Sequence, residues 1–382
     1  MAGPVTAELA FTRAEEVTRE AGVARARTLP PAAMQAPGAF ARRPCEITDL
    51  AQGALRPELW THGFDVAELA GRARLHAVLE RVRQVERLGD DDAAAIRADL
   101  RLASLPLASG GRLRLLHVAR EGLFLRRALP GGHPRALAPG EHDAAVSVHI
   151  DQDIDGTPLR QLLRGLAPRL FRHDAPLHRN RGRLALINLW IPLGQVTRPL
   201  ALMDGRSLDR RAHQLRYALP LEGILDGRQD GMRVNDIWTG LHAAGQRWYF
   251  DSTIDAPRAF VFDTLSTPHG SFVLPGEARA AALRDAVLAA VEALTRASHD
   301  AARAALARPI DPAIAALAPA TAPLAAAIAA LEALLAEGRA LLAAPPAADV
   351  DAWAARASAA AERLVRRSLE MRAVALLSRP RP

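Results

Sequence analysis

This sequence has one cysteine and no lysine, and each of these facts excludes some classes of protein. The single cysteine, Cys45, excludes a disulfide framework and a thiolate zinc cluster, and it fits the reducing cytoplasm in which we expect the protein. Lysine is absent, so all 49 basic residues are arginines. They are interleaved with 42 acidic residues instead of forming a basic patch, so nucleic-acid binding is not predicted.

No stretch has the composition of a secretion signal or of a membrane span. The N-terminal region carries Glu8, Glu15 and Glu16, and it lacks a basic segment that leads into an apolar core. Residues 312–331 are uncharged but mostly alanine, and prolines interrupt them, whereas a membrane span needs about 20 strongly apolar residues. We therefore expect a protein without membrane segments.

Hydrophobic residues make up 49% of the 382 residues, which is ample for a large core, and their pattern changes along the chain. We predict four segments: an N-terminal leader with buttressing helices (1–109), a β core (110–275), an Ala-rich helical insertion or cap (276–365), and a last core strand with a tail (366–382). Residues 1–44 are expected to run as an extended leader over the surface.

Short strands separated by turn residues are predicted in the central segment. The candidates are residues 112–118, 146–153, 183–193, 200–203, 247–250 and 259–262. Such a series favours an antiparallel sandwich or barrel. Before it, Asp65 and Glu68 form a capping-box pattern that predicts the start of a helix, and a second helix is expected to begin within residues 90–92.

His149 and Asp151 are the first candidate metal ligands. They alternate with apolar residues in the stretch 146–153, which has the period of a half-buried strand. Residues i and i+2 of a strand share a face, so the imidazole and the carboxylate project together. This pair supplies two of the three ligands of a 2-His-1-carboxylate iron site. The second histidine is predicted to be His269, which follows the apolar strand 259–262.

A candidate site for a carboxylate ligand lies near the C-terminus, in a segment of the form R-x-S-x-E-x-R. If this segment is a strand, Arg366 and Ser368 share a face and can hold a carboxylate together, with Arg372 as the alternative. A helix is the competing interpretation, because Ala-rich helical sequence leads directly into the segment. In that case Arg258 or Arg279 would take the role.

Seven short pieces of the sequence resemble, in order, those of a family of non-haem iron, 2-oxoglutarate-dependent oxygenases. They are WTHGF (60–64), VHIDQ (148–152), NLWIPL (188–193), PLALMD (199–204), RWY (247–249), PHGSF (268–272) and RRSLEMR (366–372). The family includes the hydroxylase component of cephamycin 7α-methoxylation and the fungal gibberellin-desaturase-like and meroterpenoid oxygenases. The resemblance covers roughly residues 45–275 and the tail, and Ile191 stands where the family has an arginine.

The resemblance implies a mixed, mainly β fold: a double-stranded β-helix (jelly roll, cupin-like) with flanking helices and the C-terminal helical insertion. It implies an Fe(II)- and 2-oxoglutarate-dependent dioxygenase that uses O2 to hydroxylate or desaturate an unactivated C–H of a secondary metabolite or peptide. The implied site residues are the catalytic metal ligands His149, Asp151 and His269, and the 2-oxoglutarate-binding residues Arg366, Ser368, Arg372, Asn188 and Trp190.

Two other functions remain open from the sequence. One is a catalytically silent jelly-roll binding module with a helical interaction domain, which the departure at Ile191 and the inserted helices favour. The other is a helical interaction protein in which residues 277–365 have the main role. The Ala-rich helices also offer a surface through which two copies of the chain could form a homodimer.

Overall fold

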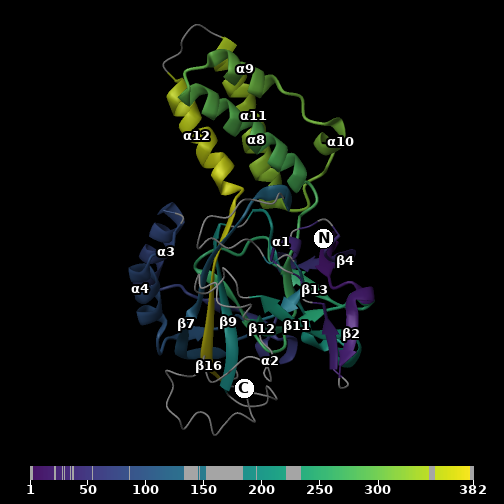
Figure 1. The fold of residues 1–382 in the computed structure, drawn as a ribbon. Helices are drawn as coiled ribbons and strands as arrows, with labels where there is room; N and C mark the ends of the chain where they lie inside the picture. The colour runs from purple at the N-terminus through teal and green to yellow at the C-terminus, as the bar shows by residue number, and fades with distance from the viewer. Residues whose placement is uncertain are drawn as a thin grey trace.

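Two β-sheets and a group of C-terminal helices make up the computed structural model (Figure 1). The structure describes residues 3–378 except 21, 22, 28, 30, 35, 37, 54, 86, 133–144, 146, 152–183, 195, 221–233 and 344–348. Within the described part of the chain, no helix is long and apolar enough to cross a membrane.

The larger sheet has ten strands and carries the N-terminal region. Its order is β1 (Val5–Phe11), β4 (Ala41–Asp49), β13 (Trp248–Phe250), β10 (Leu200–Met203), β15 (His269–Ser271), β8 (His149–Ile150), β12 (Val234–Gly240), β11 (Gln214–Pro220), β3 (Val23–Ala26) and β2 (Val17–Glu20). The pairs β4–β13 and β3–β11 are parallel, and the other neighbours are antiparallel. The expectation of a surface leader over residues 1–44 is wrong, because β1 to β4 are strands of this sheet.

The smaller sheet has six strands, all antiparallel to their neighbours. Its order is β5 (Phe64–Glu68), β14 (Arg258–Asp263), β9 (Leu184–Gly194), β16 (Arg366–Ser378), β7 (Arg112–Ala128) and β6 (Ser104–Pro106). The helices α3 (Ala73–Val85) and α4 (Asp90–Leu100) contribute to the apolar cluster on its outer face. Its inner face meets the larger sheet through a cluster that includes Trp190, Leu202 and Phe260. The two curled sheets form a jelly-roll-like core.

Several predicted elements are confirmed. Residues 184–193, 200–203 and 259–262 lie in β9, β10 and β14, residue 183 lies outside the described residues, and α4 begins at Asp90. The helix predicted to start at Asp65 is wrong at its beginning, because residues 64–68 form β5 and the helix begins at Ala73. Of the opening strand 146–153, only His149–Ile150 is β structure, and residues 146, 152 and 153 lie outside the described residues.

The C-terminal helices gather at one end of the β core (Figure 1). They are α8 (Glu277–Thr295), α9 (His299–Ala307), α10 (Pro312–Ala315), α11 (Ala322–Ala343) and α12 (Val350–Arg363). Their buried side chains are continuous with those of the larger sheet, such as Ile47, Phe250 and Phe272. After α12 the chain returns to the core as β16, so the predicted strand is confirmed over the helical alternative. The division of the chain into four segments stays a prediction.

Two short helices connect to strands of the core. The first, α2 (Leu59–His62), precedes β5, and the second, α7 (Arg210–His213), follows β10. A further short helix, α1 (Pro31–Met34), connects β3 to β4. Of these residues, Leu59 of α2 belongs to the apolar cluster of the smaller sheet.

Candidate metal centre

His149 and His269 lie opposite each other on two neighbouring strands of the larger sheet. Strands β8 and β15 are antiparallel, and their register pairs these two residues directly. Residues paired in this way project to the same face of a sheet, so the two imidazole rings meet with their centroids 4.3 Å apart. Asp151 follows His149 by two residues and joins them from the end of β8. Regular strand geometry therefore assembles the cluster.

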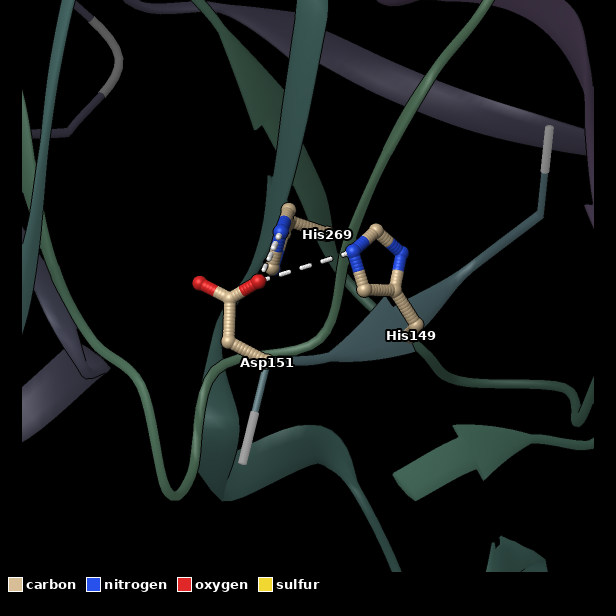
Figure 2. Close-up of side chains that lie close together, drawn as sticks. All are labelled: His149, Asp151 and His269. Carbon is tan, nitrogen blue, oxygen red and sulfur yellow. Dashed lines mark ion pairs between the residues drawn. The ribbon is translucent and has the colours of Figure 1, made fainter. Parts of the chain in front are cut away.

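The three predicted metal ligands converge on one point (Figure 2). The Nε2 atoms of His149 and His269 each lie 3.7 Å from Oδ1 of Asp151. One ligand atom from each residue falls within 4.8 Å of the other two, and in the described part of the chain no other group of three or more His, Cys, Asp or Glu residues could hold a metal ion. His269 and Asp151 are buried, and the His149 side chain is 15% exposed.

Backbone carbonyl groups orient both imidazole rings. Nδ1 of His149 lies 2.9 Å from the carbonyl oxygen of Ser147, and Nδ1 of His269 lies 3.1 Å from that of Thr267. A carbonyl oxygen can only accept a hydrogen bond, so each Nδ1 is the protonated nitrogen. Each Nε2 then presents its lone pair towards Asp151, which is the arrangement of a metal-binding histidine.

Two polar side chains from the smaller sheet hold the carboxylate of Asp151. Nδ2 of Asn188, on β9, donates to Oδ2 at 2.9 Å, and Nη2 of Arg372, on β16, lies 3.3 Å from Oδ1. Burial opposes ionisation of this carboxyl, but the effects of its neighbours, of which the charge of Arg372 is the largest, outweigh burial and hold the pKa of Asp151 well below the usual value. Asp151 is therefore an anion at neutral pH.

His269 is held in its neutral form. Burial and the neighbouring His149 lower its pKa to about 4, against a smaller opposing effect of Asp151. A neutral imidazole and an ionised carboxylate are the protonation states that bind a divalent cation. Two imidazole nitrogens and one carboxylate oxygen form the donor set typical of non-haem Fe(II), so the residues present fit that metal.

The predicted carboxylate anchor lies on the inner face of the smaller sheet. Arg366 is 1% exposed, and it donates to the carbonyl oxygen of Arg198 at 3.1 Å and to Oγ of Ser368 at 3.2 Å. Its guanidinium lies over the ring of Trp190, 5.5 Å from the centroid. The structure thus brings Arg366, Ser368 and Trp190 together, while contact of any of them with a co-substrate stays a prediction.

Further along β16, Glu370 and Arg372 lie on the same face as Arg366, and Arg372 reaches the metal ligands. Arg372 pairs with Asn188, and Glu370 pairs with Trp190, so these four side chains share the inner face with Arg366. Arg372 contacts Asp151, which places this alternative anchor beside the metal ligands. Ile191 faces the other way, into the apolar cluster below α3 and α4, so the family's arginine is replaced at a position outside the site.

The other two arginines considered for the anchor are engaged elsewhere. Arg258 pairs with Asp251 at 3.5 Å and with Asp255 at 3.6 Å, and Arg279 pairs with Glu332 on α11. Arg258 or Arg279 was expected to bind the carboxylate only if residues 366–372 formed a helix. These residues form a strand, so neither arginine is needed as the anchor.

An ion pair near the site, and the contact that joins the turn of the WTHGF motif to Thr267, could not be found from the sequence. Nε of Arg126, on β7, lies 2.7 Å from Oε1 of Glu370. The turn of the WTHGF motif contains Gly63 at φ +89°, whose carbonyl oxygen accepts from Oγ1 of Thr267 at 2.7 Å. Since the carbonyl of Thr267 orients His269, the motif supports a metal ligand. The sequence marks this turn through the motif, but no spacing in it indicates the contact with Thr267.

Comparisons with known proteins found a family model and solved structures that resemble this chain. A family model described as an oxidoreductase/YMDC permease-like domain matches residues 123–289. Two solved structures resemble the chain over 98% of both lengths: the iron and alpha-ketoglutarate-dependent endoperoxidase NvfI (13% identity, TM-score 0.48) and NvfI in a different conformation (14% identity, TM-score 0.50). None of the curated proteins matches the sequence. At this identity, the second of these structures shows a shared fold.

Proposed function

We propose that this protein is an Fe(II)- and 2-oxoglutarate-dependent oxygenase. The observation that carries the proposal is the convergence of His149, Asp151 and His269 inside a jelly-roll-like core. Two further findings support it. The fold is shared with a protein whose name states iron and alpha-ketoglutarate dependence, and the matching family model is described as an oxidoreductase.

The chemistry that Fe(II) with 2-oxoglutarate would supply in this site is the activation of O2 for hydroxylation or desaturation of an unactivated C–H. Nε2 of His149, Nε2 of His269 and a carboxylate oxygen of Asp151 would hold the metal ion. A metal ion held by only three protein ligands would keep further positions for the co-substrates. Asn188 would keep the carboxylate of Asp151 oriented through its hydrogen bond.

Arg366 and Ser368 would bind the distal carboxylate of 2-oxoglutarate. A guanidinium suits this role because it stays charged when buried and can donate two parallel hydrogen bonds to a carboxylate. The aromatic ring of Trp190 holds the guanidinium from one face and separates it from water. A co-substrate bound in this way would lie on the inner face of the smaller sheet, which also carries Arg372 beside Asp151.

The substrate is proposed to be a small molecule or a peptide, and nucleic acid is not proposed as a partner. The arginine-rich composition permits an acidic group on the substrate without indicating one. Location in the cytoplasm and association of two chains through the Ala-rich helices stay predictions.

Formation of succinate tests the proposal. The purified protein, supplied with Fe(II), 2-oxoglutarate and O2, should convert 2-oxoglutarate to succinate slowly even without its substrate. His149→Ala should abolish this turnover, and His299→Ala, which changes an exposed histidine on α9, should leave it unchanged. Succinate formation that His149→Ala does not affect would contradict the assignment of the site.

A further inference from the structure

Glu277, the first residue of α8, lies at the junction of the helices and the β core. Its side chain is fully buried, and its carboxylate accepts hydrogen bonds from three backbone N–H groups in three segments. Oε1 accepts from Gly131 at 2.9 Å, and Oε2 accepts from Leu274 at 2.9 Å and from Arg198 at 3.1 Å. In addition to the apolar packing, this carboxylate therefore ties the start of the helical region to the core by hydrogen bonds.

One of these three donors, Arg198, has a strained backbone. Its φ is +51°, a left-handed conformation that residues other than glycine rarely adopt, and it precedes Pro199, which restricts its backbone further. Such conformations persist only where surrounding contacts impose them. The hydrogen bond from its N–H to Glu277 is a contact of this kind.

The carbonyl group of Arg198 in turn holds the predicted carboxylate anchor. It accepts from Nη1 of Arg366 at 3.1 Å and from Oγ of Ser271 at 3.2 Å. Ser271 belongs to β15, the strand that carries the metal ligand His269. The backbone of Arg198 therefore connects the anchor on β16, the metal-binding strand β15 and the first residue of α8.

We propose that Glu277 is a positioning residue for 2-oxoglutarate binding, which acts through the backbone of Arg198 on the guanidinium of Arg366. The inserted helices would then determine, through Glu277, how the guanidinium of Arg366 is oriented. The inference rests on the proposed function, because it takes Arg366 as the residue that binds 2-oxoglutarate. It assigns no contact between Glu277 and the co-substrate.

The test measures two affinities in the full-length protein under anaerobic conditions: that for Fe(II) alone and that of the Fe(II)-loaded protein for 2-oxoglutarate, both by calorimetric titration. Glu277→Ala should weaken 2-oxoglutarate binding about tenfold or more, because Arg366 loses its fixed direction, and should change Fe(II) affinity less than about twofold. The matched control is Glu332→Ala, which removes an exposed carboxylate of α11 and should change neither affinity.

A pair of variants at Arg198 keeps the test decisive if Glu277→Ala fails to fold. Arg198→Gly accepts the left-handed backbone without strain, so it should keep 2-oxoglutarate affinity within about twofold. Arg198→Val cannot hold that conformation, and it should weaken 2-oxoglutarate binding at least fivefold while Fe(II) binding stays.

The results separate this inference from the proposed function. Wild-type protein that binds Fe(II) but no 2-oxoglutarate would overturn both. Normal binding by the wild type, together with unchanged 2-oxoglutarate affinity in folded Glu277→Ala or in Arg198→Val, would overturn the positioning role alone. An equal loss in Arg198→Gly and Arg198→Val would also overturn it, because the side chain and not the backbone of Arg198 would then be responsible.

Discussion

The metal ligands and the carboxylate anchor occupy one interior but are held in place by different means. His149 and His269 are placed by the register of adjacent strands, and carbonyl groups only two residues away orient their rings. Arg366 is oriented by the backbone of Arg198, which depends on Glu277 at the start of the inserted helices. The imidazole rings are thus oriented by carbonyl groups close to them in the chain, whereas the guanidinium of Arg366 is oriented by contacts that reach to the inserted helices. Perturbation of the second set of contacts should therefore weaken 2-oxoglutarate binding without weakening Fe(II) binding.

The largest effect is expected at Asp151. Asp151→Asn replaces the buried anion by a neutral amide, so affinity for Fe(II) should fall at least ~100-fold and 2-oxoglutarate turnover should be lost with it. Bound iron, measured by elemental analysis after dialysis, checks the prediction. Asp300→Asn changes a carboxylate that is 90% exposed and should retain iron. Retention of iron by Asp151→Asn would exclude this carboxylate as a ligand.

A change at the anchor should give the opposite selectivity. Arg366→Lys keeps the charge but loses the planar pair of donors, so 2-oxoglutarate affinity should fall about 10–100-fold while Fe(II) affinity stays. Calorimetric titration measures both. The control is Arg356→Lys, at an exposed arginine of α12. If Fe(II) binding fell as much as 2-oxoglutarate binding, the two parts of the site would not be separable in this way.

Asn188 contacts the metal ligand Asp151 and also lies on the face that carries the carboxylate anchor. Its substitution shows whether it serves Fe(II) binding or 2-oxoglutarate binding. Asn188→Ala removes the donor to Oδ2 of Asp151, so Fe(II) affinity should fall about tenfold, as is usual for residues that orient a metal ligand. The affinity of the Fe(II)-saturated protein for 2-oxoglutarate should change less. A loss confined to 2-oxoglutarate would instead assign Asn188 to the co-substrate.

The smallest effect is expected at the turn behind His269. A Cβ at Gly63 would lie 2.5 Å from Oγ1 of Thr267, so Gly63→Ala should displace the residue that orients His269 and lower the free energy of unfolding by about 1–3 kcal/mol. Gly71→Ala is the matched control, because Gly71 has a similar φ of +82° with open space around it. Equal losses in urea denaturation would show that the backbone conformation alone is responsible.

Much of the site followed from local patterns. Alternation predicts strands such as β9 and β16, and the i, i+2 spacing predicts that His149 and Asp151 project together. The strand over residues 64–68 was mistaken for a helix start for a physical reason. Asp65 and Glu68 have the spacing of a capping box, but the residues from Phe64 to Glu68 pair with β14 instead, and Asp65 accepts hydrogen bonds from Val66 and Ser109 and not from the N–H groups two or three residues on that an N-cap binds.

The contacts that join distant segments could not be predicted. Arg372 reaches Asp151 because the two sheets face each other, and Glu277 reaches Arg198 because α8 begins next to the segment between β9 and β10. No spacing in the sequence relates such pairs. The surface leader was mistaken for the same reason, since β4 is placed by its parallel pairing with β13, far along the chain.

Anaerobic titration of the Fe(II)-loaded protein with 2-oxoglutarate tests the central claim most directly. If His149, Asp151 and His269 hold iron with open positions for the co-substrate, a weak visible charge-transfer band should develop and saturate at one 2-oxoglutarate per iron. His269→Ala should show no such band. An iron-loaded protein that develops no band, or a band that His269→Ala retains, would contradict the account.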